Sequence, residues 1–200
     1  MSAPASVSGN GHQPAATHPT PIPYPANPVM KWAYKFPILL WRLGLGRITG
    51  RLFLVLTTTG RKSGLPRRTA IEYHTWHGRK YIYSAWGDRA QWYKNILADP
   101  LVTVQTSDGA ESMTARRVVD EDELADAYGM VEQNRQMRQW VKLLLGEELT
   151  RERFLAEKER FFLVALDPAK EPTPPPQSAD LWWVWLLLGA TVLAWRISRR

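Results

Sequence analysis

Residues 52–76 read LFLVLTTTGRKSGLPRRTAIEYHTW, and this stretch decides the fold. Its first part, Leu52–Thr59, is apolar and rich in β-branched residues, which is typical of a strand. A loop bounded by glycine follows, and Arg68–Trp76 then resumes a pattern of β-branched and aromatic residues. The stretch therefore predicts two strands joined by a basic loop.

Strand signals continue toward the C-terminus. A turn at His77-Gly78 leads to a third strand over Lys80–Ala85, and Asp99-Pro100 ends a short helix over Ala90–Ala98. Short strands with antiparallel turns and one inserted helix favour a mainly β fold with helices (α+β), closed into a barrel, over a doubly wound sheet. The remaining predicted elements are strands over Leu101–Thr106, Glu111–Val119 and Arg160–Leu166, and a charged helical region over 121–158 that breaks near Gly146.

The flanks of the barrel have a different character. Residues 1–28 lack apolar periodicity and predict a disordered tail, so the barrel domain with its N-terminal helix is expected over 29–168. Apolar residues recur at helical spacing over 29–45, with cations between them and a kink expected at Pro37. This helix is interpreted either as a cap on the barrel or as a basic amphipathic helix on a membrane surface.

The C-terminal flank predicts a membrane anchor. Residues 169–179 are proline-rich and are interpreted as a stiff linker. Residues 180–198 include fifteen positions without a charge, Leu181–Trp195, framed by tryptophans as in the aromatic belts of a membrane span. We expect a transmembrane helix there, with Arg196 snorkelling toward the interface because the apolar run is short.

Composition narrows the classes of function. The chain carries 26 Lys+Arg against 19 Asp+Glu, and nine cations precede the first acidic residue, Glu72. This excess of positive charge in the N-terminal part of the chain favours an anionic partner: nucleic acid, anionic lipid or a polyanionic small molecule. The absence of cysteine excludes disulfides and thiolate chemistry, and the four histidines show no metal-binding helix pair, so no metal site is expected.

Two stretches carry the candidate site. The loop within Thr58–Arg68 combines cations, hydroxyls and glycines, and is interpreted either as a phosphate or carboxylate site or as a solvated basic turn. The second stretch, Ser84–Asn95, places small residues at a strand end, where a flat ring can approach the backbone. Its two tryptophans could stack on such a ring, although Trp92 could equally face the core.

Together these stretches resemble the deazaflavin-dependent nitroreductase family. The resemblance rests on Thr58–Arg67, on Trp92-Tyr93-Lys94-Asn95 and on Asp99-Pro100, and covers about 47–119 plus the closing strand. It implies a split β-barrel (FMN-binding-like) that binds coenzyme F-420, a deazaflavin with a phosphate and an oligoglutamate tail. The resemblance assigns the phosphate and tail to Arg61, Lys62, Ser63, Gly64, Pro66 and Arg67. It places Thr69, Ala70 and Ile71 along the ring, Ser84, Ala85, Trp86 and Gly87 facing it, and Trp92 packing nearby.

The implied chemistry is hydride transfer from the reduced ring to a lipophilic acceptor such as a quinone, a nitroaromatic or an enone. The alternatives are an FMN- or FAD-dependent reductase of the same fold and a non-catalytic carrier of the cofactor. No nucleic-acid partner is expected, because no base-stacking module or recognition helix is present. No catalytic residue is assigned, although Glu72, Tyr73 and His74 are candidate proton donors. We expect a membrane-anchored enzyme whose barrel faces the cytoplasm, and the sequence leaves its oligomeric state, including a homodimer, open.

Overall fold

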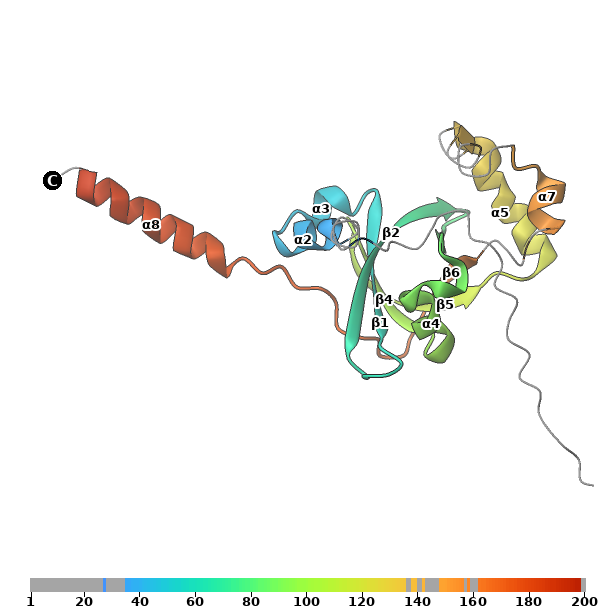
Figure 1. The fold of residues 1–200 in the computed structure, drawn as a ribbon, viewed down its shortest axis with the longest axis horizontal. Helices are drawn as coiled ribbons and strands as arrows, with labels where there is room; N and C mark the ends of the chain where they lie inside the picture. The colour runs from blue at the N-terminus through green and yellow to red at the C-terminus, as the bar shows by residue number, and fades with distance from the viewer. Residues whose placement is uncertain are drawn as a thin grey trace, which may run out of the picture.

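Six antiparallel strands close into a barrel in the order β1-β2-β3-β6-β5-β4 (Figure 1). This computed structural model describes residues 27, 35–135, 138, 139, 142, 148–156, 158 and 162–198. The closed barrel confirms the fold expected from residues 52–119 and the closing strand. The strands are β1 (Phe53–Thr59), β2 (Pro66–Trp76), β3 (Arg79–Tyr83), β4 (Leu101–Thr106), β5 (Gly109–Arg117) and β6 (Leu163–Pro168).

Pairing in the barrel places alternate side chains inside and outside. Leu54 and Leu56 of β1 are fully buried in the main apolar core, together with Val102 and Val104 of the neighbouring strand β4. The residues between them on β1 and β4 face the outer side of the sheet. The packed interior therefore leaves the outer surface and the ends of the barrel for a ligand.

Several strand boundaries differ from the expected ones. β2 begins two residues early, at Pro66, because it pairs with β1 as far as Thr59. β3 ends at Tyr83, so Ser84 and Ala85 lie in a turn rather than in a strand. The expected start of the last strand, Arg160, lies outside the described residues, as do the break near Gly146 and, apart from Asn27, the tail expected over 1–28.

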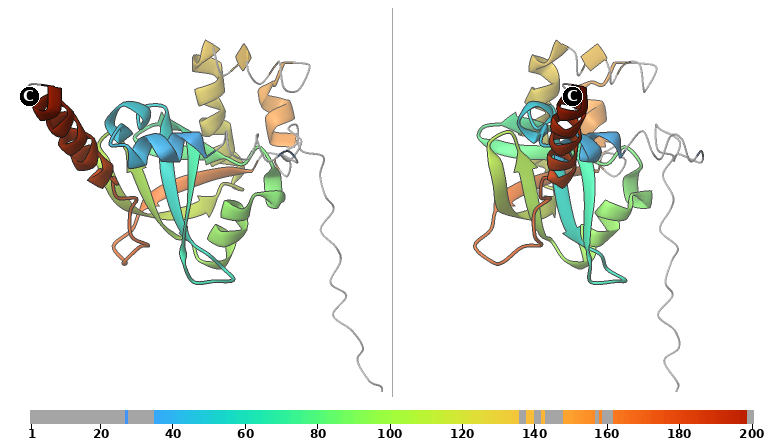
Figure 2. Two further views of the ribbon diagram at one scale, coloured as in Figure 1. Left: turned by 60° about the vertical axis from the view of Figure 1, so that its left-hand side comes forward. Right: turned by 90° about the vertical axis from the view of Figure 1, so that its left-hand side faces the viewer.

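The helices cover the ends and one side of the barrel (Figure 2). Pro37 occupies the first turn of α2 (Phe36–Arg42), so the expected kink is wrong: the ring begins the described helix, where its missing N–H leaves no bond broken. The other helices are α3 (Gly46–Thr49), the 3-10 turn η1 (Gly87–Arg89), α4 (Gln91–Ala98), α5 (Glu121–Gln133) and α7 (Arg151–Ala156).

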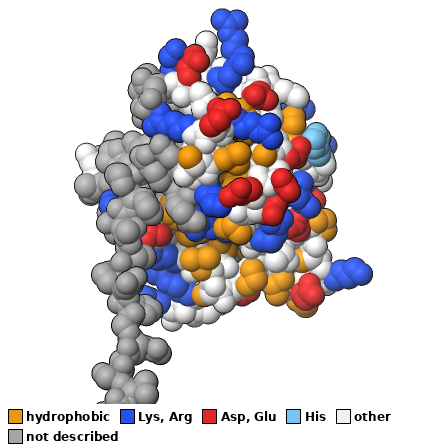
Figure 3. All heavy atoms as spheres, turned by 90° about the vertical axis from the view of Figure 1, so that its right-hand side faces the viewer, with side chains coloured by type: hydrophobic (Ala, Val, Ile, Leu, Met, Phe, Trp, Pro, Cys, Tyr) orange, Lys and Arg blue, Asp and Glu red, His pale blue; other side chains and the backbone are white. Residues whose placement is uncertain are grey.

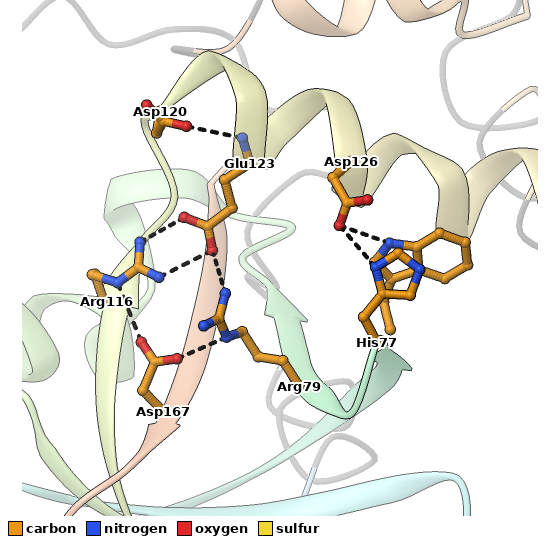
Figure 4. A network of polar contacts seen from close by, with 8 residues as sticks. His77, Arg79, Arg116, Asp120, Glu123, Asp126 and Asp167 are labelled. Carbon is orange, nitrogen blue, oxygen red and sulfur yellow. Dashed lines mark hydrogen bonds and ion pairs between the residues drawn. The ribbon is translucent and has the colours of Figure 1, made fainter.

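A network of ion pairs ties α5 to the barrel (Figure 4). Arg116 of β5 donates to both carboxylate oxygens of Glu123 at 2.8 and 3.0 Å, and its Nε lies 3.2 Å from Asp167 of β6. Arg79 of β3 reaches the same two carboxylates at 3.1 and 2.8 Å. Hydrogen bonds from Arg116 hold the pKa of the Glu123 carboxyl below its ordinary value. This face of the molecule mixes acidic and basic side chains (Figure 3).

The C-terminal helix α8 (Trp182–Ser198) projects away from the barrel (Figures 1 and 2). Its exposed side chains include Trp185, Leu186, Val192 and Ile197. Within the described part of the chain, no helix combines the length and apolarity needed to cross a membrane. The transmembrane helix expected over 180–198 is therefore not supported.

Candidate functional site

A groove of about 1160 Å³ opens at the end of the β1–β2 hairpin. Its walls come from α2, from the hairpin loop and the start of β2, from α4, and from residues 177–180, which precede α8. The described lining residues are Lys35, Phe36, Ile38, Leu39, Arg42, Gly60, Arg61, Lys62, Ser63, Pro66, Arg67, Arg68, Thr69, Gln91, Trp92, Asn95, Gln177, Ser178, Ala179 and Asp180.

The hairpin loop is held in shape by its own hydrogen bonds. The N–H of Gly60 donates to the Leu65 carbonyl at 2.9 Å, and the N–H groups of Ser63 and Gly64 donate to the Gly60 carbonyl at 3.0 and 2.7 Å. Gly64 adopts a φ of +65°, which a side chain disfavours. Because these N–H groups are already paired within the loop, its side-chain cations are the main groups it can offer an anion.

Arg61 is fixed to α4 by three contacts. Its N–H and its Nη1 donate to Asn95 Oδ1 at 3.3 and 3.1 Å, and its Nη2 donates to Gln91 Oε1 at 3.0 Å. The buried Asn95 in turn donates to Thr58 Oγ1 at 3.0 Å. The motif residue Asn95 thus orients the loop on the barrel, which places it in a supporting role.

The electrostatic character of the groove is strongly positive. Asp180 is the single acidic residue among the described lining residues, and it pairs with Arg42 at 3.0 Å. Arg67 is oriented by Ser63, whose Oγ accepts from Arg67 Nη2 at 3.3 Å. Charges at such a wall attract a phosphate or carboxylate ligand and position it by charge-assisted hydrogen bonds. The described cations of the lining are Lys35, Arg42, Arg61, Lys62, Arg67 and Arg68.

The structure brings together only part of the predicted cofactor set. Seven residues line the groove: Arg61, Lys62, Ser63, Pro66, Arg67, Thr69 and Trp92. Gly64 lies in the same loop, where it sets the turn. The groove lining does not include Ala70, Ile71, Ser84, Ala85, Trp86 or Gly87.

The residues predicted along the ring divide between two faces of β2. Thr69 and Ile71 pair with Leu56 and Leu54 of β1 and share the inner face, and Ile71 packs against the core. Ala70 pairs with Val55 and therefore points to the outer face. The three side chains therefore lie on two faces of β2, and the role predicted for Ala70 along the ring stays a prediction.

The turn after β3 is held by an internal hydrogen bond and packs against the core. Ser84 is buried, and its Oγ donates to the Gly87 carbonyl at 2.8 Å, while Gly87 adopts a φ of +55°. Trp86 packs on the main core. Trp92 is also buried, and its ring meets Tyr93 edge to face at 5.8 Å between centroids, so it serves the core and the groove together.

The candidate proton donors lie away from the groove lining. Tyr73 donates to the Gly50 carbonyl at 3.1 Å, and burial raises the pKa of its hydroxyl. The Glu72 side chain is largely exposed, and His74 lies 3.8 Å from it. The contacts of these three residues are structural, and none of them assigns a residue to proton transfer.

Two walls of the groove were missed from the sequence. Lys35, Phe36 and Leu39 belong to a helix whose amphipathic spacing was recognised, but that spacing did not place the helix beside the basic loop. Residues 177–180 were missed because a proline-rich composition indicates stiffness without showing where a segment lies.

Comparison with known proteins adds an independent observation. Residues 43–140 match the protein family described as F-420H(2)-dependent quinone reductase. Among solved structures, one described as an F-420-H(2)-dependent reductase (FDR-A) shares 26% identity, with 58% of this chain and 93% of that chain covered and a TM-score of 0.38. Another, described as an F-420 reductase, shares 18% identity, with 59% and 86% covered and a TM-score of 0.33.

The haem storage protein HutZ from Vibrio cholerae shares 15% identity, with 68% of this chain and 90% of that chain covered and a TM-score of 0.41. The family match spans the basic loop, α4 and strands β1 to β5. Helix α2, strand β6 and everything that follows it lie outside the matched residues.

Proposed function

Because residues 43–140 place this chain in the family of F-420H(2)-dependent quinone reductases, we propose that it reduces a lipophilic acceptor such as a quinone, a nitroaromatic or an enone. It is an oxidoreductase that depends on coenzyme F-420. When bound, the cofactor supplies the hydride, and the protein binds it, orients it and excludes water from the reacting atoms.

The groove fits such a cofactor in charge and in size. Its cations Arg61 and Lys62 lie in the hairpin loop, and Arg67 lies at the start of β2. An anionic phosphate and tail would be held by these side chains. Its volume of about 1160 Å³ suits an elongated ligand, since sites for drug-sized molecules occupy roughly 300–1,000 Å³. The gathering of six cationic side chains in the lining of one groove is the observation that carries the proposal.

The apolar side of the groove supports a lipophilic acceptor. Phe36 and Leu39 of α2 line it while remaining 44% and 38% exposed, and Trp92 lines it from α4. Exposed apolar side chains at a binding groove favour a ligand that removes them from water. An aromatic acceptor would also find a ring surface to pack against.

Two measurements test this proposal. The purified chain should quench the fluorescence of coenzyme F-420 and bind FMN more weakly, because FMN lacks the long acidic tail. It should then oxidise the reduced cofactor, without oxygen, when a quinone is added. Binding without turnover for any quinone, nitroaromatic or enone would favour the cofactor carrier, and stronger binding of FMN would favour the flavin alternative.

We also propose that α8 attaches the enzyme to a lipid bilayer with the barrel on the cytoplasmic side. Its exposed apolar residues include Trp185, Leu187, Leu188 and Trp195, and a helix that is apolar all round is typically covered by a protein core or by lipid. Attachment would confine the groove to the layer in which a lipophilic acceptor dissolves, and so raise the effective concentration of that acceptor. A cytosolic supply of the cofactor supports the cytoplasmic orientation.

A further inference from the structure

The proline-rich segment between β6 and α8 lies against the barrel. We name residues 173–180 the strap. At its start, Thr173 Oγ1 lies 2.7 Å from Thr103 Oγ1 of β4 and 2.9 Å from Ser112 Oγ of β5. Thr103 Oγ1 also donates to the carbonyl of Pro174. Two adjacent strands therefore hold the first residues of the strap.

Further hydrogen bonds continue across the barrel. Gln105 of β4 donates from Nε2 to the Gln177 carbonyl at 3.0 Å and accepts from the Gln177 N–H at 2.6 Å. Arg68 of β2 donates from Nη2 to the carbonyls of Pro175 and Pro176, each at 3.3 Å. Because prolines have no N–H to donate, these residues of the strap are held through their carbonyls, which accept from side chains of the barrel.

The register of the barrel explains the path of the strap. Arg68, Thr57, Thr103 and Ser112 are successive cross-strand partners on β2, β1, β4 and β5, so they form one row across the outer face. The strap runs along this row and is bonded to three of its four members. Thr57 is the fourth, and its buried Oγ1 has no hydrogen-bond partner among the described residues.

Burial on the same face shows that the strap is packed rather than loosely apposed. Val55 and Thr57 are fully buried although they face outward, and Thr103 and Gln105 are only 3% and 7% exposed. Polar side chains on an outer strand face are normally solvated, whereas Thr103 and Gln105 are buried and take the strap as their hydrogen-bond partner.

The strap then enters the groove. Gln177, Ser178, Ala179 and Asp180 are lining residues, and the Asp180 N–H donates to the Arg42 carbonyl at 2.8 Å. The Asp180 carboxylate pairs with the Arg42 guanidinium at 3.0 Å. The same few residues thus form part of the groove wall and fasten the segment before α8 to α2.

We propose that the strap forms part of the cofactor-binding surface of the groove, and that strap docking and cofactor binding stabilise each other. Gln105 is then a positioning residue, because its side chain holds the strap in its docked position. This inference rests on the proposed function of the groove. The coupling is reciprocal by linkage: if the docked strap strengthens cofactor binding, bound cofactor must strengthen docking by the same factor. The segment outside the family match thereby contributes to the affinity of the matched site.

The test uses the full chain and two readouts. In Gln105→Leu, both side-chain bonds to Gln177 are lost, so backbone amides over 177–180 should exchange hydrogen faster in the free protein. The dissociation constant for coenzyme F-420, measured by fluorescence quenching, should rise by at least about fivefold, as expected for a coupled pair of sites. In the unchanged protein, adding the cofactor should slow exchange over 177–180.

A matched pair guards against a folding defect at Gln105. Thr103→Val removes the hydroxyl that bonds Thr173 and Pro174 and should weaken cofactor binding, whereas Thr103→Ser keeps the hydroxyl and should restore it. Faster strap exchange with an unchanged dissociation constant would overturn the coupling and leave the proposed function intact. Failure of the unchanged protein to bind the cofactor would overturn both.

Discussion

Charge reversal at two neighbouring residues of the basic loop should separate binding from stability. Lys62 and Arg61 both line the groove, but Arg61 also makes three contacts to α4. Lys62→Glu should therefore weaken binding of coenzyme F-420 with little change in thermal stability. Arg61→Glu should weaken binding and also lower the melting temperature, because it removes the side-chain bonds to Gln91 and Asn95.

The magnitude follows from the kind of contact. A hydrogen bond to a charged group contributes about 1.5–3 kcal/mol. Because this loop is exposed, we take about 1.5 kcal/mol per residue, which is close to tenfold in affinity. The double variant should thus bind about a hundredfold more weakly, a loss of roughly 3 kcal/mol. The difference should shrink in salt, since the screening length falls from about 10 Å at 0.1 M to about 3 Å at 1 M.

Fluorescence titration at low and high salt measures the affinity, and thermal unfolding without cofactor measures the stability. Lys94→Glu is the matched control for each single variant, because it makes the same change in net charge from a position outside the groove lining. Binding of the double variant with unchanged affinity at low salt would refute the reasoning and make the loop a solvated turn.

Four further outcomes are expected. Asp180→Asn removes the ion pair that fastens the strap to Arg42, so it should weaken cofactor binding by roughly two- to fivefold in the same titration; tighter binding would contradict this. The lowered pKa of Glu123 means that its ion pairs stabilise the fold fully above the ordinary value of 4.5, and that this contribution is lost as pH falls through the lowered pKa. Urea unfolding of Glu123→Gln should accordingly show a smaller loss of stability on acidification than the unchanged protein. Gly64→Ala should lower stability by about 1 kcal/mol because of its positive φ, and Gly64→Asn by less, both read from urea midpoints. A chain ending at Asp180 keeps the groove wall but lacks α8, so it should retain cofactor affinity and lose co-sedimentation with phospholipid vesicles; equal sedimentation of both chains would remove the proposed attachment.

The strands could be predicted from the sequence because their apolar and β-branched composition is a local signal. Leu52–Thr59 and Leu101–Thr106 carry enough apolar and β-branched residues to indicate strands without knowledge of their partners. The boundaries depended on pairing: β2 begins at Pro66 because Thr59 extends the ladder. The strand period of two also separates Ala70 from Thr69 and Ile71, and this separation could be read from the sequence alone.

The missing parts of the site depended on tertiary contacts. Thr103 and Gln105 occupy outward positions on β4, where polar residues normally indicate solvent, and only the strap explains their burial. The prolines before α8 predicted a stiff linker, but composition indicates stiffness and does not show where such a segment lies. The basic loop was recognisable because its cations are adjacent in sequence, whereas Lys35 and Arg42 come to the groove through folding.

The place of β6 in the barrel determines the order in which this protein can fold. β6 inserts between β3 and β5, and Tyr83 pairs with Leu163 across a long interval of sequence. The β1–β2 and β4–β5 hairpins need only local contacts, but barrel closure must await this distant pairing, and non-local pairing is slow. The strap follows β6 in the chain, and it completes the groove wall only when it has docked on β2, β4 and β5. During refolding, full affinity for the cofactor should therefore appear only after this last wall has formed.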